Sequence, residues 1–325
     1  PTTKPPWPLR KKLLIFIPVT LVVLGLALGL GLGLTLGRDS SDDSETSPPP
    51  SPPLPSPSTK PLWTPQINST FQIVLAHTIN LPSSSSSITP NVSIYDVDLF
   101  ETPPETIATL HRLGKKVLCY FSAGSYEPGR PDAGEFKEED LGEELEGWPG
   151  ERWVRLGSER VRGVMKGRVE LAKRKGCDGV DPDNVDGFQN KNGLSLTPQS
   201  SIDFLQYLSN LTTPLNLTLG LKNAGDIITQ VLPIVHFSVN EQCVEYNECA
   251  TFRPFIDAGK PVFHIEYPRD AGRKLGDDVR GRYCAEKDTR GFSTVLKKME
   301  LDGWVEYCDG RVEVTEIEGG SSGEE

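Results

Sequence analysis

The sequence predicts an α/β protein whose body is a TIM (β/α)8 barrel, preceded by a single transmembrane helix and a Pro/Ser-rich stalk. Short β-branched runs recur through the body with helical patterns between them, and this alternation predicts a parallel sheet. Eight such runs are present, and eight strands close naturally into a barrel. The chain has 325 residues, which leaves room for a barrel of roughly 250.

The first element is an uncharged stretch at residues 13–37, rich in Leu, Val, Ile and Gly. At 1.5 Å per residue it spans the hydrocarbon core of a membrane, roughly 30 Å thick. Basic residues precede the stretch and acidic residues follow it, so residues 1–12 are expected in the cytosol. We therefore expect a single-pass type II membrane protein with its body at the cell surface or in a lumen. The alternative is a cleaved signal peptide, whose apolar region is usually shorter.

Residues 38–61 consist mostly of Ser, Pro, Asp and Thr, a composition typical of a disordered, extended stalk. The barrel is expected at residues 62–312. Residues 313–325 read as a disordered acidic tail, with weak strand pairing at its start. N-glycosylation sequons occur only after the span, which agrees with a glycoprotein body outside the cytosol. They lie at Asn68, Asn91, Asn210 and Asn216.

All six cysteines also follow the span, where an oxidising compartment favours disulfides. We expect Cys243 to pair with Cys249 and Cys284 with Cys308. The remaining two, Cys119 and Cys177, either pair across neighbouring strands or stay as buried thiols. The spacings match no zinc pattern and only four histidines exist, so we expect no metal and no cofactor.

The charge distribution bears on partners. The chain has 34 Lys and Arg, 45 Asp and Glu, and a formal net charge of -11. Five of the basic residues precede every acidic one, so the body is more acidic than the whole chain. Such a body would repel nucleic acid and attract a cationic ligand. We expect a monomer that does not bind nucleic acid.

The expected elements of the body follow from local patterns. Glycines at 114, 176 and 259 mark helix ends. A doubly wound open sheet is the alternative fold, but no Gly-x-Gly-x-x-Gly follows the first strand. Strands are expected at 71–76, 93–100, 116–122, 177–183, 217–223, 236–241, 261–267 and 292–297, and helices at 106–113, 160–175, 200–211 and 252–258.

An acidic motif at residues 176–187, G-C-D-G-V-D-P-D-N-V-D-G, ends the fourth expected strand. Pro182 cannot continue a central strand, so the strand stops near it. Carboxylates crowded at the carboxyl end of a barrel strand repel one another, which raises some pKa values and enables acid/base chemistry. The alternatives are a calcium loop, although the EF-hand spacing is absent, and a solvated acidic turn.

Polar residues at several other strand ends predict a cleft for a polyhydroxylated or amino sugar. Glycoside hydrolysis requires two carboxyl groups beside the scissile bond, and Asp183 and Glu241 fit this requirement. The competing carboxylates are Asp98, Asp181 and Glu266. Residues expected to bind substrate are Asp98, Tyr120, Ser122, Asp181, Asn184, Lys222, Asn223, Asn240, Glu266 and Tyr267. Aromatic residues that could support sugar faces are Tyr120, Tyr126, Trp148, Trp153 and Tyr267.

Eight segments over roughly residues 63–310 resemble glycoside hydrolase family 114, the endo-α-1,4-polygalactosaminidases, and in particular its fungal membrane-anchored members. They include Y-D-V-D-L-F-E-T at 95–102, G-K-K-V-L-C-Y-F-S-A-G-S at 114–125, G-W-P-G-E-R-W at 147–153, D-P-D-N-V-D-G-F at 181–188, G-L-K-N-A at 220–224, V-N-E-Q-C at 239–243 and G-K-P-V-F-H-I-E-Y at 259–267. Each segment alone is weak, and together they are specific.

The resemblance implies a barrel that hydrolyses α-1,4-linked galactosamine polymers, such as deacetylated galactosaminogalactan, at internal bonds. It implies that Asp183 is the nucleophile and Glu241 the acid/base, with Asp98, Lys222 and Asn223 lining the sugar site. Many members have Glu where this chain has Asp181, a difference that could alter a subsite. Galactosamine is cationic near neutral pH, which suits an acidic site.

Two other functions stay open at this point. The enzyme could act on another amino-sugar polymer, such as chitosan. The body could also be a catalytically silent polysaccharide-binding protein tethered to the membrane, although a pure binder needs no carboxylate pair. An adhesion protein is not supported, since the chain has no internal repeat.

Overall fold

The structure is a computed structural model and describes residues 61–319. The predicted cytoplasmic tail, the membrane span and nearly all of the stalk lie outside these residues, as do residues 320–325. Between residues 61 and 319, no helix combines the length and the apolar character needed to cross a membrane.

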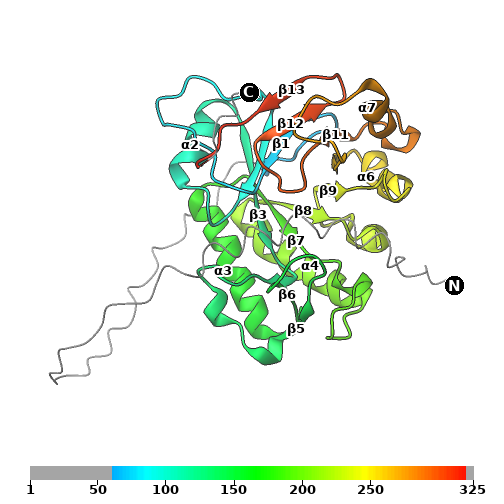
Figure 1. Ribbon diagram of the computed structural model, residues 1–325. Helices are drawn as coiled ribbons and strands as arrows, with labels where there is room; N and C mark the ends of the chain where they lie inside the picture. Colours follow the sequence, from blue (N-terminus) through cyan, green and yellow to red (C-terminus); the bar gives the residue numbers. More distant parts are fainter. Residues whose placement is uncertain (1–60, 320–325) are drawn as a thin grey trace, which may run out of the picture. The chain divides into compact units, whose positions relative to one another are not determined.

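The body is a mixed α/β fold built on a curled ten-stranded sheet (Figure 1). Eight strands pair in parallel in chain order, and each lies within a run that the sequence predicts as a strand. They are β1 (Phe71–Val74), β2 (Ile94–Asp98), β3 (Lys116–Ser122), β7 (Gly179–Asp183), β8 (Thr218–Lys222), β9 (Phe237–Glu241), β10 (Val262–Glu266) and β11 (Ser293–Leu296).

Past β11 the sheet continues into two antiparallel strands, β12 (Trp304–Tyr307) and β13 (Val312–Val314). Within residues 61–319 no ladder joins β11 to β1. Instead, the Leu75 N–H donates to the Leu301 carbonyl at 2.9 Å, and the Tyr307 hydroxyl donates to the Phe71 carbonyl at 3.4 Å. These bonds bring the two ends of the sheet together, an arrangement consistent with a TIM-like barrel. The predicted end of the barrel, residue 312, is the first residue of β13.

Helices lie between the strands, and their ends follow local signals. The Ser158 side chain caps the first turn of α3 (Glu159–Lys175), and Gly176 ends that helix with φ 96°. Thr197 and Ser200 form a capping box at the start of α4 (Pro198–Thr212). The helices are α2 (Pro104–Arg112), α3 (Glu159–Lys175), α4 (Pro198–Thr212), α5 (Ile228–Val231), α6 (Arg253–Asp257) and α7 (Asp277–Cys284).

The interior of the curled sheet changes character along the strands. Toward their amino ends it is aromatic, since the ring of Phe263 lies 4.9 Å from that of Phe71 and 5.7 Å from that of Phe237. A Cβ at Gly220 would lie 2.5 Å from the Phe237 ring, so a larger residue would not fit there. The polar residues inside the curled sheet lie further along the strands, toward their carboxyl ends.

A second, three-stranded sheet follows β3, with β6 (Arg152–Val154) between β4 (Ser125–Tyr126) and β5 (Leu141–Glu144). All six cysteines form disulfides. The two expected pairs are confirmed, and Cys119 pairs with Cys177, which joins β3 to the segment before β7.

Candidate active site

The carboxyl ends of three neighbouring strands bring Asp183, Lys222 and Glu241 together. Lys222 Nζ lies 3.2 Å from Asp183 Oδ2 and 3.2 Å from Glu241 Oε2. The Lys222 side chain is only 2% exposed, and a buried ammonium is tolerated when carboxylates surround it. The two carboxylates that the sequence nominates for catalysis therefore share one counter-ion.

Asp183 is held at both of its oxygens. The Tyr120 hydroxyl donates to Oδ2 at 3.0 Å, and the Asn184 backbone N–H donates to Oδ1 at 2.7 Å. Asn184 has φ 61°, a left-handed conformation that Asn adopts more readily than most residues. Ser122 Oγ lies 3.4 Å from the Tyr120 hydroxyl. Four residues predicted from the sequence thus meet at the junction of β3 and β7.

Glu241 is fixed by a second set of predicted residues. The Tyr267 hydroxyl donates to Oε1, and Asn223 Nδ2 donates to Oε2 at 3.1 Å. Asn223 Oδ1 also accepts the Glu241 backbone N–H at 2.9 Å, and Asn240 Nδ2 lies 3.4 Å from the same oxygen. The side chain and the backbone of Glu241 are therefore both set by Asn223.

The environment decides the protonation of these groups. Burial by itself would raise the pKa of Glu241, but Lys222 and the hydrogen bonds from Tyr267 and Asn223 outweigh it and lower the pKa. Burial would lower the pKa of Lys222, but Asp183, Glu241 and Asp181 raise it well above the usual value. Glu241 and Lys222 are thus an ionised pair in the free protein.

Below this pair, Asp96 and Asp181 form a buried carboxyl pair. Asp181 is 0% exposed, and within residues 61–319 neither of its oxygens, nor Oδ1 of Asp96, receives a hydrogen bond from a donor group. Burial and the charge of Asp181 raise the pKa of Asp96 well above its usual value. Burial, together with the charges of Asp183 and Glu241, raises the pKa of Asp181 to about 7. Asp181, a predicted substrate-binding residue, therefore lies inside the curled sheet and away from solvent.

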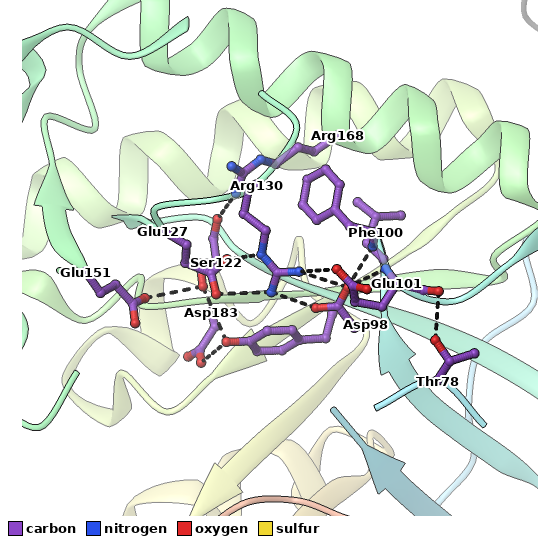
Figure 2. Close-up of polar contacts among 12 residues, drawn as sticks. Thr78, Asp98, Phe100, Glu101, Ser122, Glu127, Arg130, Glu151, Arg168 and Asp183 are labelled. Atoms are coloured by element: carbon purple, nitrogen blue, oxygen red, sulfur yellow. Dashed lines mark hydrogen bonds and ion pairs between the residues drawn. The ribbon is translucent and has the colours of Figure 1, made fainter. Parts of the chain in front are cut away.

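Asp98, another predicted substrate-binding residue, pairs with an arginine (Figure 2). Arg130 donates to both of its oxygens, at 3.1 and 2.7 Å. The backbone N–H groups of Phe100 and Glu101 donate to Oδ1, each at 2.8 Å. The Asp98 carboxylate is thus occupied by four donors and orders the loop after β2.

Glu266 lies on the opposite face of β10 from Tyr267. It is 0% exposed, accepts the Val244 N–H at 2.7 Å and lies 2.8 Å from His264 Nε2. It is not brought together with Asp183 and Glu241. His264 is also close to Cys243 and Cys249, but these cysteines form a disulfide, so their sulfurs are not free thiolate ligands for a metal.

One residue of the site does not appear among the sequence predictions. Oε1 of Glu151 accepts from Ser125 Oγ at 2.6 Å and Asn184 Nδ2 at 3.1 Å. It also accepts from Ser122 Oγ at 3.4 Å (Figure 2). Burial and the nearby charges of Glu127 and Asp183 raise the pKa of Glu151 to about 7. The only local signal is the pair of glycines at 147 and 150, which predicts a tight turn before it.

The aromatic residues predicted to support sugar faces differ in how exposed they are. Trp153 is 5% exposed and packs against Gly187 in the core, which is ordinary packing. Trp148 is 58% exposed at the tip of the turn before β6. Burial and the charges of Asp183 and Glu241 raise the pKa values of Tyr120 and Tyr267, so both phenols remain hydrogen-bond donors at neutral pH.

The sequence and the fold resemble those of known proteins. The model of glycoside-hydrolase family GH114 matches residues 53–313. The crystal structure of Aspergillus fumigatus Ega3 in complex with galactosamine is 47% identical, with a TM-score of 0.72 over 77% of this chain and 99% of that chain. The glycoside hydrolase domain of PelA from Pseudomonas aeruginosa has a TM-score of 0.57 over the same shares at 14% identity, a likeness of fold alone. No match was found among curated proteins.

The family model covers most of the chain, and Ega3 is similar over nearly its full length. The chain is therefore a glycoside hydrolase and belongs to glycoside-hydrolase family GH114.

Proposed function

We propose that this chain is an endo-α-1,4-galactosaminidase, a (β/α)8-barrel enzyme that cleaves internal bonds of α-1,4-linked galactosamine polymers with Asp183 as nucleophile and Glu241 as acid/base. Similarity to Ega3, which was solved with galactosamine, supports the substrate class. The observation that carries the residue roles is the Lys222 ammonium placed 3.2 Å from both carboxylates.

In the proposed first step, an oxygen of Asp183 attacks the anomeric carbon. The glycosidic bond breaks, and the departing oxygen takes a proton from Glu241. In the second step, Glu241 takes a proton from water. The resulting hydroxide displaces Asp183 from the anomeric carbon, which restores the carboxylate of Asp183 and the protonated carboxyl group of Glu241. Glu241 has a lowered pKa in the free protein, so the first step is favoured at acidic pH.

The geometry favours retention of configuration. Two oxygens that each lie 3.2 Å from Lys222 Nζ cannot be further apart than twice that distance. This upper limit, which applies to one oxygen of each carboxyl group, includes the carboxyl separation of retaining glycosidases, about 5–5.5 Å, and lies at the lower edge of that of inverting ones, about 6.5–9.5 Å. A direct displacement by water would need more room between Asp183 and Glu241.

Hydrolysis of deacetylated α-1,4-galactosamine polymer tests the proposal. Released reducing ends are measured for the wild type, Asp183→Asn and Glu241→Gln, with circular dichroism as a check on folding. We expect each substitution to reduce activity by at least about 100-fold. Asp203→Asn, an exposed carboxylate on α4, is the matched control and should keep full activity.

The outcomes separate the alternatives. Wild-type cleavage of chitosan but not of the galactosamine polymer would select the other amino-sugar substrate. Binding without cleavage would select the tethered binding protein. Activity that survives either substitution would assign the chemistry to another carboxylate.

We also propose that residues 13–37 anchor the enzyme in a membrane with its body outside the cytosol. Three disulfides suit an oxidising compartment. Three of the sequon asparagines, Asn68, Asn91 and Asn210, are exposed, so glycans could be attached there. A mobility shift after enzymatic deglycosylation, together with retention in the membrane pellet at high pH, is the expected result. A soluble, unglycosylated protein would contradict it.

A further inference from the structure

Glu151 reaches the active site from a tightly closed turn. The Trp148 N–H donates to the Leu145 carbonyl and the Glu151 N–H to the Trp148 carbonyl, each at 3.1 Å. The Leu145 N–H donates to the Glu151 carbonyl at 2.8 Å. Gly147 and Gly150 have φ 93° and 85°, values that disfavour other residues. The backbone of Glu151 is therefore fixed before any ligand binds.

The Glu151 side chain is held at one oxygen only. Ser125, Asn184 and Ser122 all donate to Oε1. In the part of the chain that the structure describes, no hydrogen bond reaches Oε2, and no Lys, Arg or His pairs with this carboxylate. Glu127 differs in this respect, because both of its oxygens accept from Arg130 (Figure 2).

Glu151 is linked to the proposed nucleophile Asp183 through hydrogen bonds to Asn184. Asn184, which donates its side-chain amide to Glu151, directly follows Asp183 and donates its backbone N–H to Asp183 Oδ1. The partly buried Glu151 carboxylate also lies among the like charges of Glu127 and Asp183, without a cation of its own. An ammonium group at Oε2 would supply the missing counter-charge and the missing donors.

We infer that Glu151 is a specificity-determining residue that binds, through Oε2, the 2-ammonium group of a galactosamine residue at or next to the one that Asp183 attacks. The inference rests on the proposed function and deepens it. A deacetylated sugar offers a positive charge with three N–H donors at this place. An N-acetylated sugar offers one N–H, no charge and a larger group, so Glu151 selects against it.

Steady-state kinetics of the full chain on deacetylated and on N-acetylated α-1,4-galactosamine polymers test the assignment. Glu151→Gln keeps a carbonyl oxygen to accept from Ser125 and Asn184 but removes the charge. We expect its KM for the deacetylated polymer to rise about tenfold or more, the size of one lost charge-assisted hydrogen bond. The change in kcat should be less than about threefold, and the preference for the deacetylated polymer should fall by the factor that KM rises.

Two further variants isolate the charge. Glu138→Gln removes a carboxylate of the same region that is 81% exposed and already paired with Arg152, and it should leave the polymer preference unchanged. Ser125→Ala removes a donor to Oε1 but keeps the Glu151 charge. It should lower kcat or stability without changing the preference. If Glu151→Gln lowers kcat equally on both polymers and keeps the wild-type preference, Glu151 only positions Asn184 and the inference is overturned.

Titration of the protein with galactosamine and with N-acetylgalactosamine separates this inference from the proposed function. Glu151-dependent preference for galactosamine, without cleavage of either polymer, would keep the inference and overturn the function. Cleavage of the deacetylated polymer with a preference that Glu151→Gln does not alter would keep the function and overturn the inference. Wild-type protein that binds both sugars equally would also overturn the inference.

Discussion

The ammonium of Lys222 at the end of β8 lies 3.2 Å from the carboxylate of Asp183 at the end of the neighbouring strand β7. The same ammonium contacts Glu241 on β9. Three adjacent strand ends thus carry acid, base and acid in turn. This order allows two carboxylates to remain close and ionised where they would otherwise repel each other.

The Lys222→Met variant should lose at least about 100-fold in activity, because the transition-state charge on both carboxylates loses its partner. It should also be destabilised by about 1–3 kcal/mol more at pH 8 than at pH 5, because unpaired carboxylates are protonated more easily at low pH. Urea unfolding at the two pH values measures this difference. Lys191→Met removes an exposed lysine and is the control. An equal loss of stability at both pH values would indicate lost packing alone.

Tyr267→Phe should move the basic limb of the kcat/KM profile to higher pH. Burial raises the pKa of Glu241, but Lys222 and then the Tyr267 hydrogen bond lower it, so removing that bond lets the pKa rise. A proton donor with a higher pKa stays protonated to a higher pH. We expect the maximal rate to fall by about tenfold from the lost contact. Tyr207→Phe removes a hydroxyl that donates to the Arg162 carbonyl and should leave the profile in place. An unchanged basic limb would show that Tyr267 does not tune Glu241.

Asp181→Asn should change how stability depends on pH. Burial raises the pKa of Asp181 from 3.8 to about 7, so between these values the folded wild type binds more protons than the unfolded chain. Its free energy of unfolding therefore falls as pH rises through this window. The variant cannot titrate at this position and also relieves Asp96 of a like charge. The free energy of unfolding of the variant, measured relative to that of the wild type, should therefore rise by on the order of 2–4 kcal/mol from pH 4.5 to pH 8.

Urea unfolding at pH 4.5 and pH 8 measures this gain, and Asp203→Asn, on the exposed face of α4, is the control. Parallel stability curves for the wild type and Asp181→Asn would contradict the raised pKa of Asp181.

The eight parallel strands could be predicted because each contains buried β-branched or other apolar residues. β8, for example, is buried at all five positions. The sequence also predicts weak strand pairing at the start of the tail, where β13 lies. The strands of the small sheet and β12 could not be predicted in this way. They have two to four residues, and polar residues such as Glu144 interrupt them. Such strands depend on partners from elsewhere in the chain.

Much of the site could be predicted because polar residues at the ends of parallel strands converge. The pairing of Asp98 with Arg130 could not be predicted, because Arg130 lies in a loop whose path the local sequence does not determine. Side-chain alternation along β10 does predict that Glu266 and Tyr267 face opposite ways, a signal that the strand-end argument did not use. Glu151 is one of two glutamates between β5 and β6, and only the folded turn distinguishes it from Glu146.

The central claim, a nucleophilic Asp183 beside the acid/base Glu241, is tested most directly by trapping the covalent intermediate. The protein is incubated with 5-fluoro-α-galactosaminyl fluoride, digested and analysed by mass spectrometry. One fluorosugar per chain, on the peptide that carries Asp183 and absent in Asp183→Asn, is the predicted result. Labelling of a different carboxylate, or no label together with inverted product configuration, would contradict the account.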